Sequence, residues 1–430
     1  MRIVLSLWPL LIAAAMLLSA NGLQSTVLAL RGISEGFPDA IIGLLHSAYF
    51  IGFIAGCRFA PRFIGNVGHI RAFTAFASVA SAAAIMHAMF ISPIPWLVLR
   101  IVTGFCFAAL QMILESWLND KATNQTRGQI LSIYRITDFT AVTIAQLSIA
   151  LFNMENFIVF AVLSVGLSLA LVPVALTPVE APVAPSRPKL DLARIWRVSP
   201  VAFAGAVGVG MTASAYWAMG AVFVTSFGYQ AGAVGAFIGA IILGGALAQW
   251  PIGYISDRID RRRVLVGASI GAALSAGLMM LSAQTSQTML IINAMAFGVF
   301  ALPNFGLAVA HANDHAEPGS GVQVNGGLLM LYGLAAIVGS VIAPTIMSWL
   351  GNDMLFSWIA FVYVLLAGFC LYRMTQRAAP PVQEPYVAVP RTSPTIYALD
   401  PRAAPLDEED TVPMRAPYAG DDDSPGPIQS

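Results

Sequence analysis

Residues 232–263 read GAVGAFIGAIILGGALAQWPIGYISDRIDRRR, an apolar run followed directly by a cluster of charged residues. The run at 232–254 is long enough to cross a bilayer, because one crossing needs about 20 mostly apolar residues. Lipid offers the backbone no hydrogen-bond partner, so such a run must be helical. The arginines that follow it mark the place where the chain leaves the membrane.

The same alternation of apolar runs and polar turns continues along the whole chain. Of the 430 residues, 57% are hydrophobic and only 10% are charged, and the mean hydropathy is +0.75. A soluble protein carries about 25% charged residues, so lipid must surround most of this chain. The runs predict about twelve spans, near 7–30, 40–60, 72–92, 95–118, 129–152, 156–176, 200–224, 232–254, 264–283, 287–310, 322–349 and 354–373. We therefore expect an all-α membrane protein.

The composition excludes several other classes of protein. The 22 Lys and Arg residues balance the 22 Asp and Glu residues, so no basic surface for nucleic acid is expected. The three cysteines, Cys57, Cys106 and Cys370, lie in apolar runs without metal-ligand spacing. No phosphate-binding glycine loop and no enzyme motif is found. We expect neither an enzyme nor a cofactor.

One turn of the chain contains several potential metal ligands, His311, Asp314, His315 and Glu317. The equivalent turn in the first half of the chain, at Asp120, has no histidine beside it. We therefore expect no metal site there.

The basic residues predict how the chain is oriented. Most of them fall in the turns on the side of the two termini: Arg2, Arg58, Arg62, Arg71, Lys121, Arg127, Arg187, Lys189, Arg194, Arg197, Arg258, Arg261, Arg262, Arg263, Arg373 and Arg377. The opposite side has little beyond Arg31. This pattern predicts a multi-pass protein of the bacterial inner membrane with both termini in the cytoplasm.

The chain divides into two halves that repeat in sequence. Residues 177–199 form a Pro-rich, charged linker between six spans at 1–176 and six at 200–377. The repeated positions are Asn119-Asp120, Ala122 and Gln129, which recur as Asn313-Asp314, Ala316 and Gln323 at an offset of 194. Gly43 and Pro61 fall opposite Gly235 and Pro251 at nearly the same offset. We interpret the repeat as an internal duplication that produces two pseudo-symmetric six-helix bundles.

Residues 378–430 are Pro-rich and end in acidic clusters. The low apolar content predicts a disordered cytoplasmic tail. Two interpretations stay open: a docking or regulatory segment, and a solvated extension without a role in transport.

The turn after the eighth span contains Gly253, Asp257-Arg258 and the basic cluster Arg261-Arg262-Arg263. This pattern resembles the loop motif of the major facilitator superfamily. Gly253 is expected to allow close helix approach, and Asp257 to cap a helix or pair with an arginine. In the matching turn of the first half, Ala60 stands where the carboxylate would be, so a gate there needs other partners, among them Glu115.

Two further stretches strengthen the resemblance. Arg100 precedes Gly104 by four residues, as in a second motif of the superfamily, and the run Glu115 to Asp120 followed by Arg127 resembles its YcaD-like bacterial branch. The resemblance implies two six-helix bundles around a central cavity that opens alternately to each side. It also implies a gating role for the loop residues, which include Glu115, Asp120 and Arg127. It does not identify a substrate.

Few ionisable residues lie inside the predicted spans, where they are costly and usually functional. Arg135 and Asp138 lie at i and i+3 on the fifth span and share one helix face. We hypothesise that Asp138 binds a proton during transport, or that Arg135 and Arg100 hold an anionic group of the solute. The alternative is an ion pair that only orients the fifth helix.

Other polar residues of the spans are candidates for the cavity wall: Asn21, Gln24, His46, Gln111, Gln146, Tyr216, Trp217, Asn304, Gln323 and Asn325. Each of them alone is more often an interhelical hydrogen-bonding residue than a ligand.

Together these patterns predict a secondary active transporter for a small organic solute or anion, driven by protons and monomeric in the bilayer. The alternatives are an uncoupled facilitator and a scaffold or sensor that has the same fold and moves no solute.

Overall fold

A computed structural model describes residues 2–176, 182, 190–317, 319–378 and 383–403. The helices of the first half are α1 (Arg2–Ser34), α2 (Asp39–Val67), α3 (His69–Met89), α4 (Pro93–Asp120), α5 (Arg127–Leu147) with the turn η1 (Ser148–Leu151), and α6 (Ile158–Leu169) with α7 (Leu171–Ala175). A short helix, α8 (Leu192–Val198), precedes the second half.

The second half repeats the six-helix arrangement. Its helices are α9 (Pro200–Ser226), α10 (Ala231–Ser256), α11 (Arg261–Gly277) with α12 (Met279–Thr285), α13 (Gln287–Ala301) with α14 (Pro303–Asn313), α15 (Gly321–Leu350), and α16 (Leu355–Gln376) preceded by η2 (Asn352–Met354). A last turn, η3 (Pro394–Leu399), follows beyond the bundle.

Polar residues at the turns start several of these helices. Ser199 accepts a hydrogen bond from the amide of Ala202, 3.0 Å away, and Pro200 occupies the first position of α9. Asp260 caps α11 in the same way. A short polar side chain at this position satisfies a backbone donor that the helix leaves free, and proline there loses no helical hydrogen bond.

Among the described residues, eleven helices are long and apolar enough to cross a membrane. The predicted fifth span, α5, is helical over 21 residues but is not among the eleven. Charged residues such as Arg135 and Asp138 lower its hydropathy. The prediction of an all-helical membrane protein with two six-helix bundles is confirmed.

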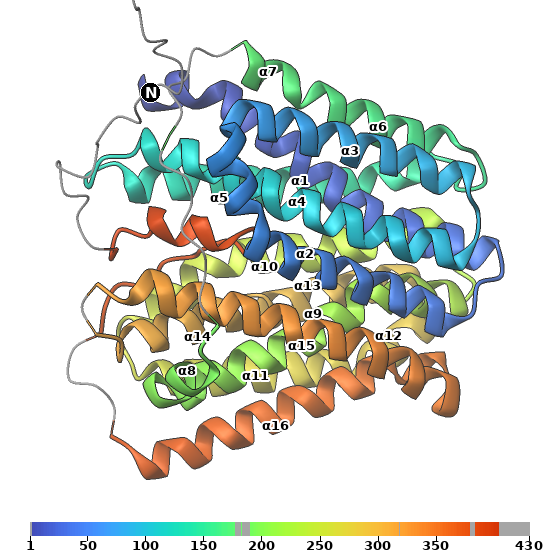
Figure 1. The fold of residues 1–430 in the computed structure, drawn as a ribbon. Coiled ribbons are helices and arrows are strands. Elements are labelled where there is room, and N and C mark those ends of the chain that lie inside the picture. The colour runs from blue at the N-terminus through green and yellow to red at the C-terminus, as the bar shows by residue number, and fades with distance from the viewer. Residues whose placement is uncertain (1, 177–181, 183–189, 318, 379–382, 404–430) are drawn as a thin grey trace, which may run out of the picture.

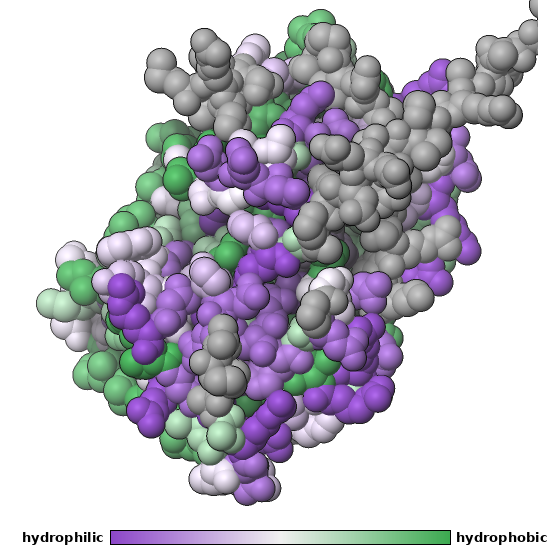
Figure 2. Space-filling model, turned by 90° about the vertical axis from the view of Figure 1, so that its left-hand side faces the viewer, coloured by the Kyte–Doolittle hydropathy of each residue, from purple (hydrophilic) through white to green (hydrophobic). Residues whose placement is uncertain are grey.

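The two halves lie side by side, the first in blue to green and the second in light green through yellow to orange (Figure 1). The N-terminus and the end of α16 lie at the same end of the bundle, which we call the terminal face; the opposite end is the far face. Figure 2 looks onto the terminal face and shows hydrophilic side chains gathered there, with apolar ones along its flanks.

Two matching contacts join the halves near the far face. A Cβ added to Gly43 at the start of α2 would lie 2.4 Å from the carbonyl oxygen of Ser340 on α15, and one added to Gly235 on α10 would lie 2.2 Å from that of Gln146 on α5. Ser340 and Gln146 are themselves 194 positions apart, so the contacts are related by the repeat. The absence of a side chain at both glycines lets the helices touch, and the far end of the interface is tightly closed.

The expectation of a disordered tail is wrong for residues 383–403, which we call the tail segment. This segment turns back from the terminal face and packs between the halves, and Ile396, Tyr397 and Leu399 are fully buried (Figure 1). The low average hydropathy of the tail concealed a short stretch with enough apolar side chains to bury. Residues 404–430 lie outside the described residues.

Replacing Gly235 by alanine tests the interface contact. The new methyl group would overlap the Gln146 carbonyl, and overpacking of this kind costs about 1–3 kcal/mol. We expect a lower thermal unfolding temperature in detergent. Gly267→Ala on α11 is the matched control, since a Cβ there has no neighbour within 4 Å and alanine favours the helix. Equal unfolding temperatures for the two variants would contradict the interface as described.

Candidate functional site

A cavity of about 200 Å³ lies between the two halves. Five of the predicted cavity residues line it, together with the predicted ion pair: Asn21, His46, Gln111, Tyr216, Trp217, Arg135 and Asp138. The aromatic residues Tyr49, Phe50 and Tyr332 complete much of its wall. Both halves therefore line the same cavity, and its wall contains polar and aromatic side chains.

The ion pair on α5 is the central polar feature of this cavity. An Nη1 atom of Arg135 lies 2.6 Å from Oδ2 of Asp138, and the guanidinium also lies 3.9 Å from the centroid of the Phe139 ring. The two side chains are 13% and 15% exposed. The i, i+3 spacing places both groups on one face of the helix, as the sequence predicted.

Two further polar residues of the wall, Asn21 and Gln111, are bonded to tyrosine hydroxyls. Asn21 donates from Nδ2 to the Tyr49 hydroxyl, 3.0 Å away. The Tyr134 hydroxyl lies 2.9 Å from Oε1 of Gln111 and 3.1 Å from Oε1 of Glu115. This chain of contacts connects the cavity wall with the buried carboxylate of Glu115.

The other predicted cavity residues lie elsewhere. Gln146 joins α5 to α1, since it accepts from Thr26 and donates to the carbonyl of Gly22, both at 3.0 Å. Asn304 accepts from Ser269 of α11, and Gln323 accepts from Arg194 at the surface. Gln24 and Asn325 are buried outside the cavity wall. Gln146 and Asn304 thus hold helices together.

Arg100 lies behind the cavity wall. Its guanidinium is 4.6 Å from the centroid of the Tyr49 ring and 3.2 Å from the Ser25 hydroxyl, and Nε reaches the Leu45 carbonyl at 3.4 Å. The side chain is only 1% exposed. In this arrangement Arg100 and Arg135 do not face one another across the cavity.

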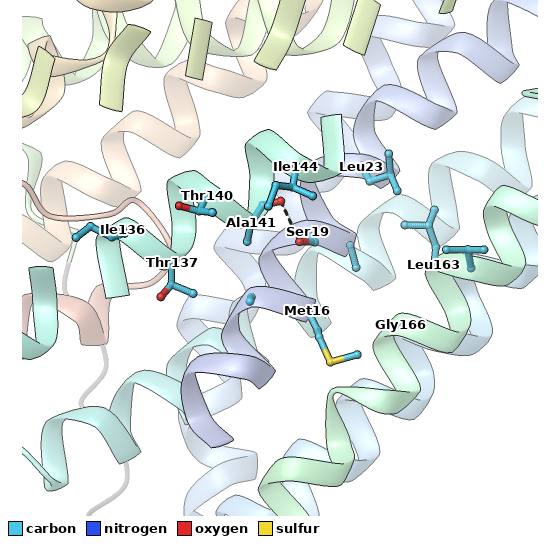
Figure 3. Close-up of a pocket in the computed structure, with 13 residues that line it drawn as sticks. Met16, Ser19, Leu23, Ile136, Thr137, Thr140, Ala141, Ile144, Leu163 and Gly166 are labelled. Carbon is cyan, nitrogen blue, oxygen red and sulfur yellow. Dashed lines mark hydrogen bonds between the residues drawn. The ribbon is translucent and has the colours of Figure 1, made fainter. Parts of the chain in front are cut away.

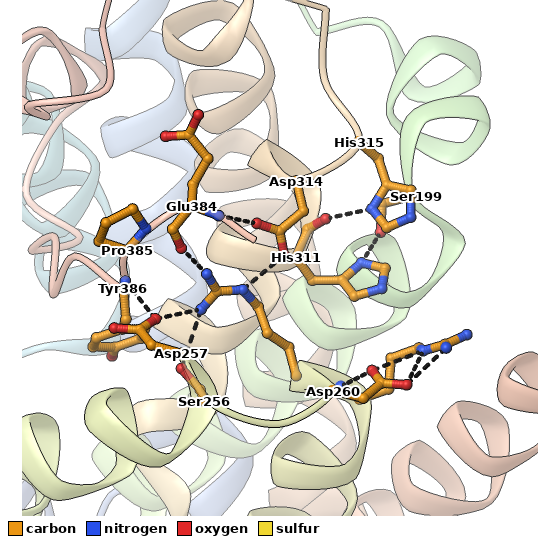
Figure 4. A network of polar contacts seen from close by, with 12 residues as sticks. Ser199, Ser256, Asp257, Asp260, His311, Asp314, His315, Glu384, Pro385 and Tyr386 are labelled. Atoms are coloured by element: carbon orange, nitrogen blue, oxygen red, sulfur yellow. Dashed lines mark hydrogen bonds and ion pairs between the residues drawn. The ribbon is translucent and has the colours of Figure 1, made fainter. Parts of the chain in front are cut away.

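The loop residues of the second half converge on Arg261 (Figure 4). Nε of Arg261 lies 2.7 Å from Asp314 and Nη1 lies 3.2 Å from Asp257, and the pair with Asp314 is almost fully buried. The guanidinium also donates to the carbonyl of Glu384 in the tail segment. The loop motif and the repeated Asn-Asp turn therefore form one network.

Other members of the loop do not join this network. Arg258 stacks on Tyr254 at the surface. Arg262 binds Asp260 at 2.7 Å and the carbonyl of Arg377 at 2.6 Å. Burial acts to raise the pKa of Asp260, but the hydrogen bonds from Arg262 outweigh it and the pKa lies below its usual value. This pair therefore stabilises the fold at neutral pH, and its contribution is lost as the pH falls through that pKa.

Gly253 has a neighbour that the sequence did not predict. A Cβ at this position would lie 2.4 Å from the Tyr386 ring of the tail segment, and one at Gly306 would lie 2.3 Å from the Tyr386 hydroxyl. The atoms nearest to Gly253 belong to this ring, not to another helix. Because Gly253 and Gly306 have no side chains, the helices leave the space that the Tyr386 ring occupies.

The first half contributes different groups at the terminal face. Asp120, the repeat partner of Asp314, is exposed and lies 3.7 Å from Lys121. Glu115 is fully buried and accepts hydrogen bonds from Thr392 and Ser393 of the tail segment. Arg127 donates to the carbonyl of Ala403 at 3.4 Å. Of the gating residues predicted in this half, Glu115 and Arg127 thus bind the tail segment, whereas Asp120, among the described residues, does not.

The potential metal ligands of the α14–α15 turn are engaged in other contacts. His311 bonds Ser199 at 2.8 Å, and the rings of His311 and His315 stack (Figure 4). Within the described part of the chain, no cluster of three or more His, Cys, Asp or Glu side chains is arranged to hold a metal ion.

A second, larger hollow of about 570 Å³ lies between α1, α5 and α6 (Figure 3). Its lining is mostly apolar, with Met16, Ile144 and Leu163, and the Ser19 hydroxyl in it bonds the carbonyl of Ala141 at 3.0 Å. Ile144 is 62% exposed. This hollow faces outward and suits lipid chains better than a polar solute.

Comparison with known proteins agrees with this geometry. The family model of the Major Facilitator Superfamily matches residues 202–406. This match spans the second half of the chain. The chain is 23% identical over 364 residues to the uncharacterized MFS-type transporter YcaD of Escherichia coli O17:K52:H18 (strain UMN026 / ExPEC), which covers 83% of this chain and 94% of that protein. An uncharacterized MFS-type transporter of Enterobacter sp. (strain 638) is 22% identical over 366 residues with the same coverage.

Solved structures of the superfamily have the same fold. The nucleoside transporter NupG superposes with a TM-score of 0.73 at 14% identity, over 88% of this chain and 100% of that one. A bacterial homolog of the human lysosomal transporter Spinster, inward-facing and unoccupied, gives 0.70 at 16% identity, over 86% and 98%. The resemblance to the superfamily and to its YcaD-like branch is confirmed.

Replacing Asp314 by asparagine tests the buried network. The change leaves Arg261 without its buried partner, and breaking such a pair costs about 3–5 kcal/mol. Asp120→Asn is the matched control, because an exposed pair contributes about 0–1 kcal/mol. We expect a large loss of thermal stability in detergent for the first variant alone. Similar losses for both would show that the network does not stabilise the fold.

Proposed function

We propose that this chain is a secondary active transporter that moves a small organic solute by alternating access. The observation that supports this most directly is the cavity between the halves, with the buried Arg135–Asp138 pair in its wall. Transporters of this architecture bind solute near the midplane, where the two repeats meet. The tight contacts at Gly43 and Gly235 supply a closed far side against which the halves can rock.

We further propose that protons drive the transport. Separating a carboxylate from its arginine changes its affinity for a proton, so a conformational change that opens the Arg135–Asp138 pair would couple proton binding to movement. Asp138 is then the coupling residue and Arg135 its switchable partner. An uncoupled facilitator keeps the cavity but needs no such pair, and a scaffold or sensor needs no solute site.

Asp138→Asn in liposomes tests the coupling. We expect that a pH gradient accelerates solute flux in the native chain and no longer does so in the variant, since asparagine does not titrate. Asp120→Asn is the control, as Asp120 lies at the exposed terminal face. An unchanged response to the gradient in Asp138→Asn would remove this residue from the mechanism.

The arginine-rich terminal face supports a cytoplasmic location for both termini. All three native cysteines are buried, which allows single exposed cysteines to be labelled. Lys121 directly follows the end of α4, and Glu155 lies in the turn between η1 and α6, at the other end of the bundle; both are exposed. With a membrane-impermeant maleimide on intact bacteria, we expect Glu155→Cys to react and Lys121→Cys to react only after lysis. The reverse pattern would invert the proposed topology.

A further inference from the structure

The tail segment, residues 383–403, joins the two halves across the terminal face. On the second half, the amide of Tyr386 donates to Asp257 at 2.7 Å and that of Glu384 to Asp314 at 3.1 Å. On the first half, Thr392 and Ser393 donate to Glu115. The turn η3 then packs against α4, α5 and α15. The segment therefore covers the cavity from this side.

Arg391 is the charged residue of the tail segment that lines the cavity. Its guanidinium lies 5.0 Å from the centroid of the Tyr332 ring and 5.8 Å from that of Phe305. It is also close enough to Asp138 and Tyr216 to interact with them electrostatically. Aromatic faces and a carboxylate form the surroundings that attract a cation out of water.

Arg391 adds a second positive charge to the one carboxylate that the described residues place in the cavity wall. Asp138 lies 2.6 Å from Arg135 on the same helix, and both line the cavity together with Arg391. Arg100 lies behind Tyr49 and is not part of the wall. The attraction for a second cation at this place therefore comes largely from the aromatic rings beside Arg391.

We propose that the pocket formed by the rings of Tyr332 and Phe305 beside Asp138 is a binding site for an organic cation, and that the tail segment, residues 383–403, is its tethered competitor. The inference rests on the proposed transport function and specifies its solute class: a small molecule with a guanidinium or amine group. In the arrangement seen here, Arg391 fills the place of that group. The segment must leave before the solute can enter from the terminal face.

The test measures binding of n-butylguanidinium to the purified full-length chain in detergent by calorimetry. Arg391→Ala removes the tethered cation, and we expect it to bind the probe at least about tenfold more tightly than the native chain. Arg391→Lys keeps a cation in place and should bind the probe as weakly as the native chain. Two further ligands are controls: n-butylurea, the uncharged analogue of nearly the same shape, and butyrate, an anion.

A second variant loosens the segment without removing Arg391. Thr392→Val with Ser393→Ala deletes both hydrogen bonds to Glu115, and the probe should bind more tightly because its competitor docks less well. Thr395→Val is the matched control, since the hydroxyl of Thr395 is buried without a hydrogen-bond partner among the described residues. Its affinity for the probe should equal that of the native chain.

The outcomes separate the site from the transport proposal. The cation site would be overturned if Arg391→Ala did not bind n-butylguanidinium more tightly, if its affinity for n-butylurea rose equally, or if it bound butyrate more tightly. The competitor role of the segment would be overturned if Arg391→Ala bound the probe more tightly and the double variant did not. Binding is read without a membrane, so tight binding without flux in liposomes would count against transport alone, and flux of an anion without probe binding would count against the site alone.

Discussion

Hydrocarbon offers no hydrogen bonds, so a polar group that this chain places in the membrane is stabilised by a partner within the protein. The helical backbone satisfies itself. Side chains do so by pairing between helices, as Gln146 does with Thr26 and the Gly22 carbonyl. The pair of Arg135 with Asp138 follows the same constraint inside the cavity. Transport therefore has to exchange such partners without leaving a group unpaired.

The two ends of the interface meet this constraint in different ways. At the far face, Gly43 and Gly235 bring backbone against backbone, and the contact is related by the repeat. At the terminal face the repeat has diverged. The second half keeps a buried Arg261–Asp314 pair, whereas Asp120 in the first half is exposed. The tail segment supplies contacts to both halves at this face, since it binds Arg261 of the second half and Glu115 of the first.

In the proposed alternating-access cycle, the tail segment acts directly on the rocking of the halves. Its contacts with Asp257 and Glu115 lie on opposite halves, so they hold only while the terminal face keeps its present spacing. In that cycle, opening of the far face brings the terminal ends of the halves together, and the tail segment lies across them. Release of the segment and solute entry are therefore linked in the proposed cycle.

The sequence by itself determined the spans, their division into two halves and the Arg135–Asp138 pair, because each depends on residues that are neighbours along one helix or run. Only the tertiary structure decided that Gln146 and Asn304 join helices instead of lining the cavity, and that Arg100 lies behind Tyr49. The tertiary structure also decided where the tail segment lies. The tail has too low an average hydropathy to predict burial, but the folded helices surround this segment with two glycines, a buried carboxylate and aromatic rings. Such partners come from distant segments, and hydropathy along the chain carries no information on which of them will meet.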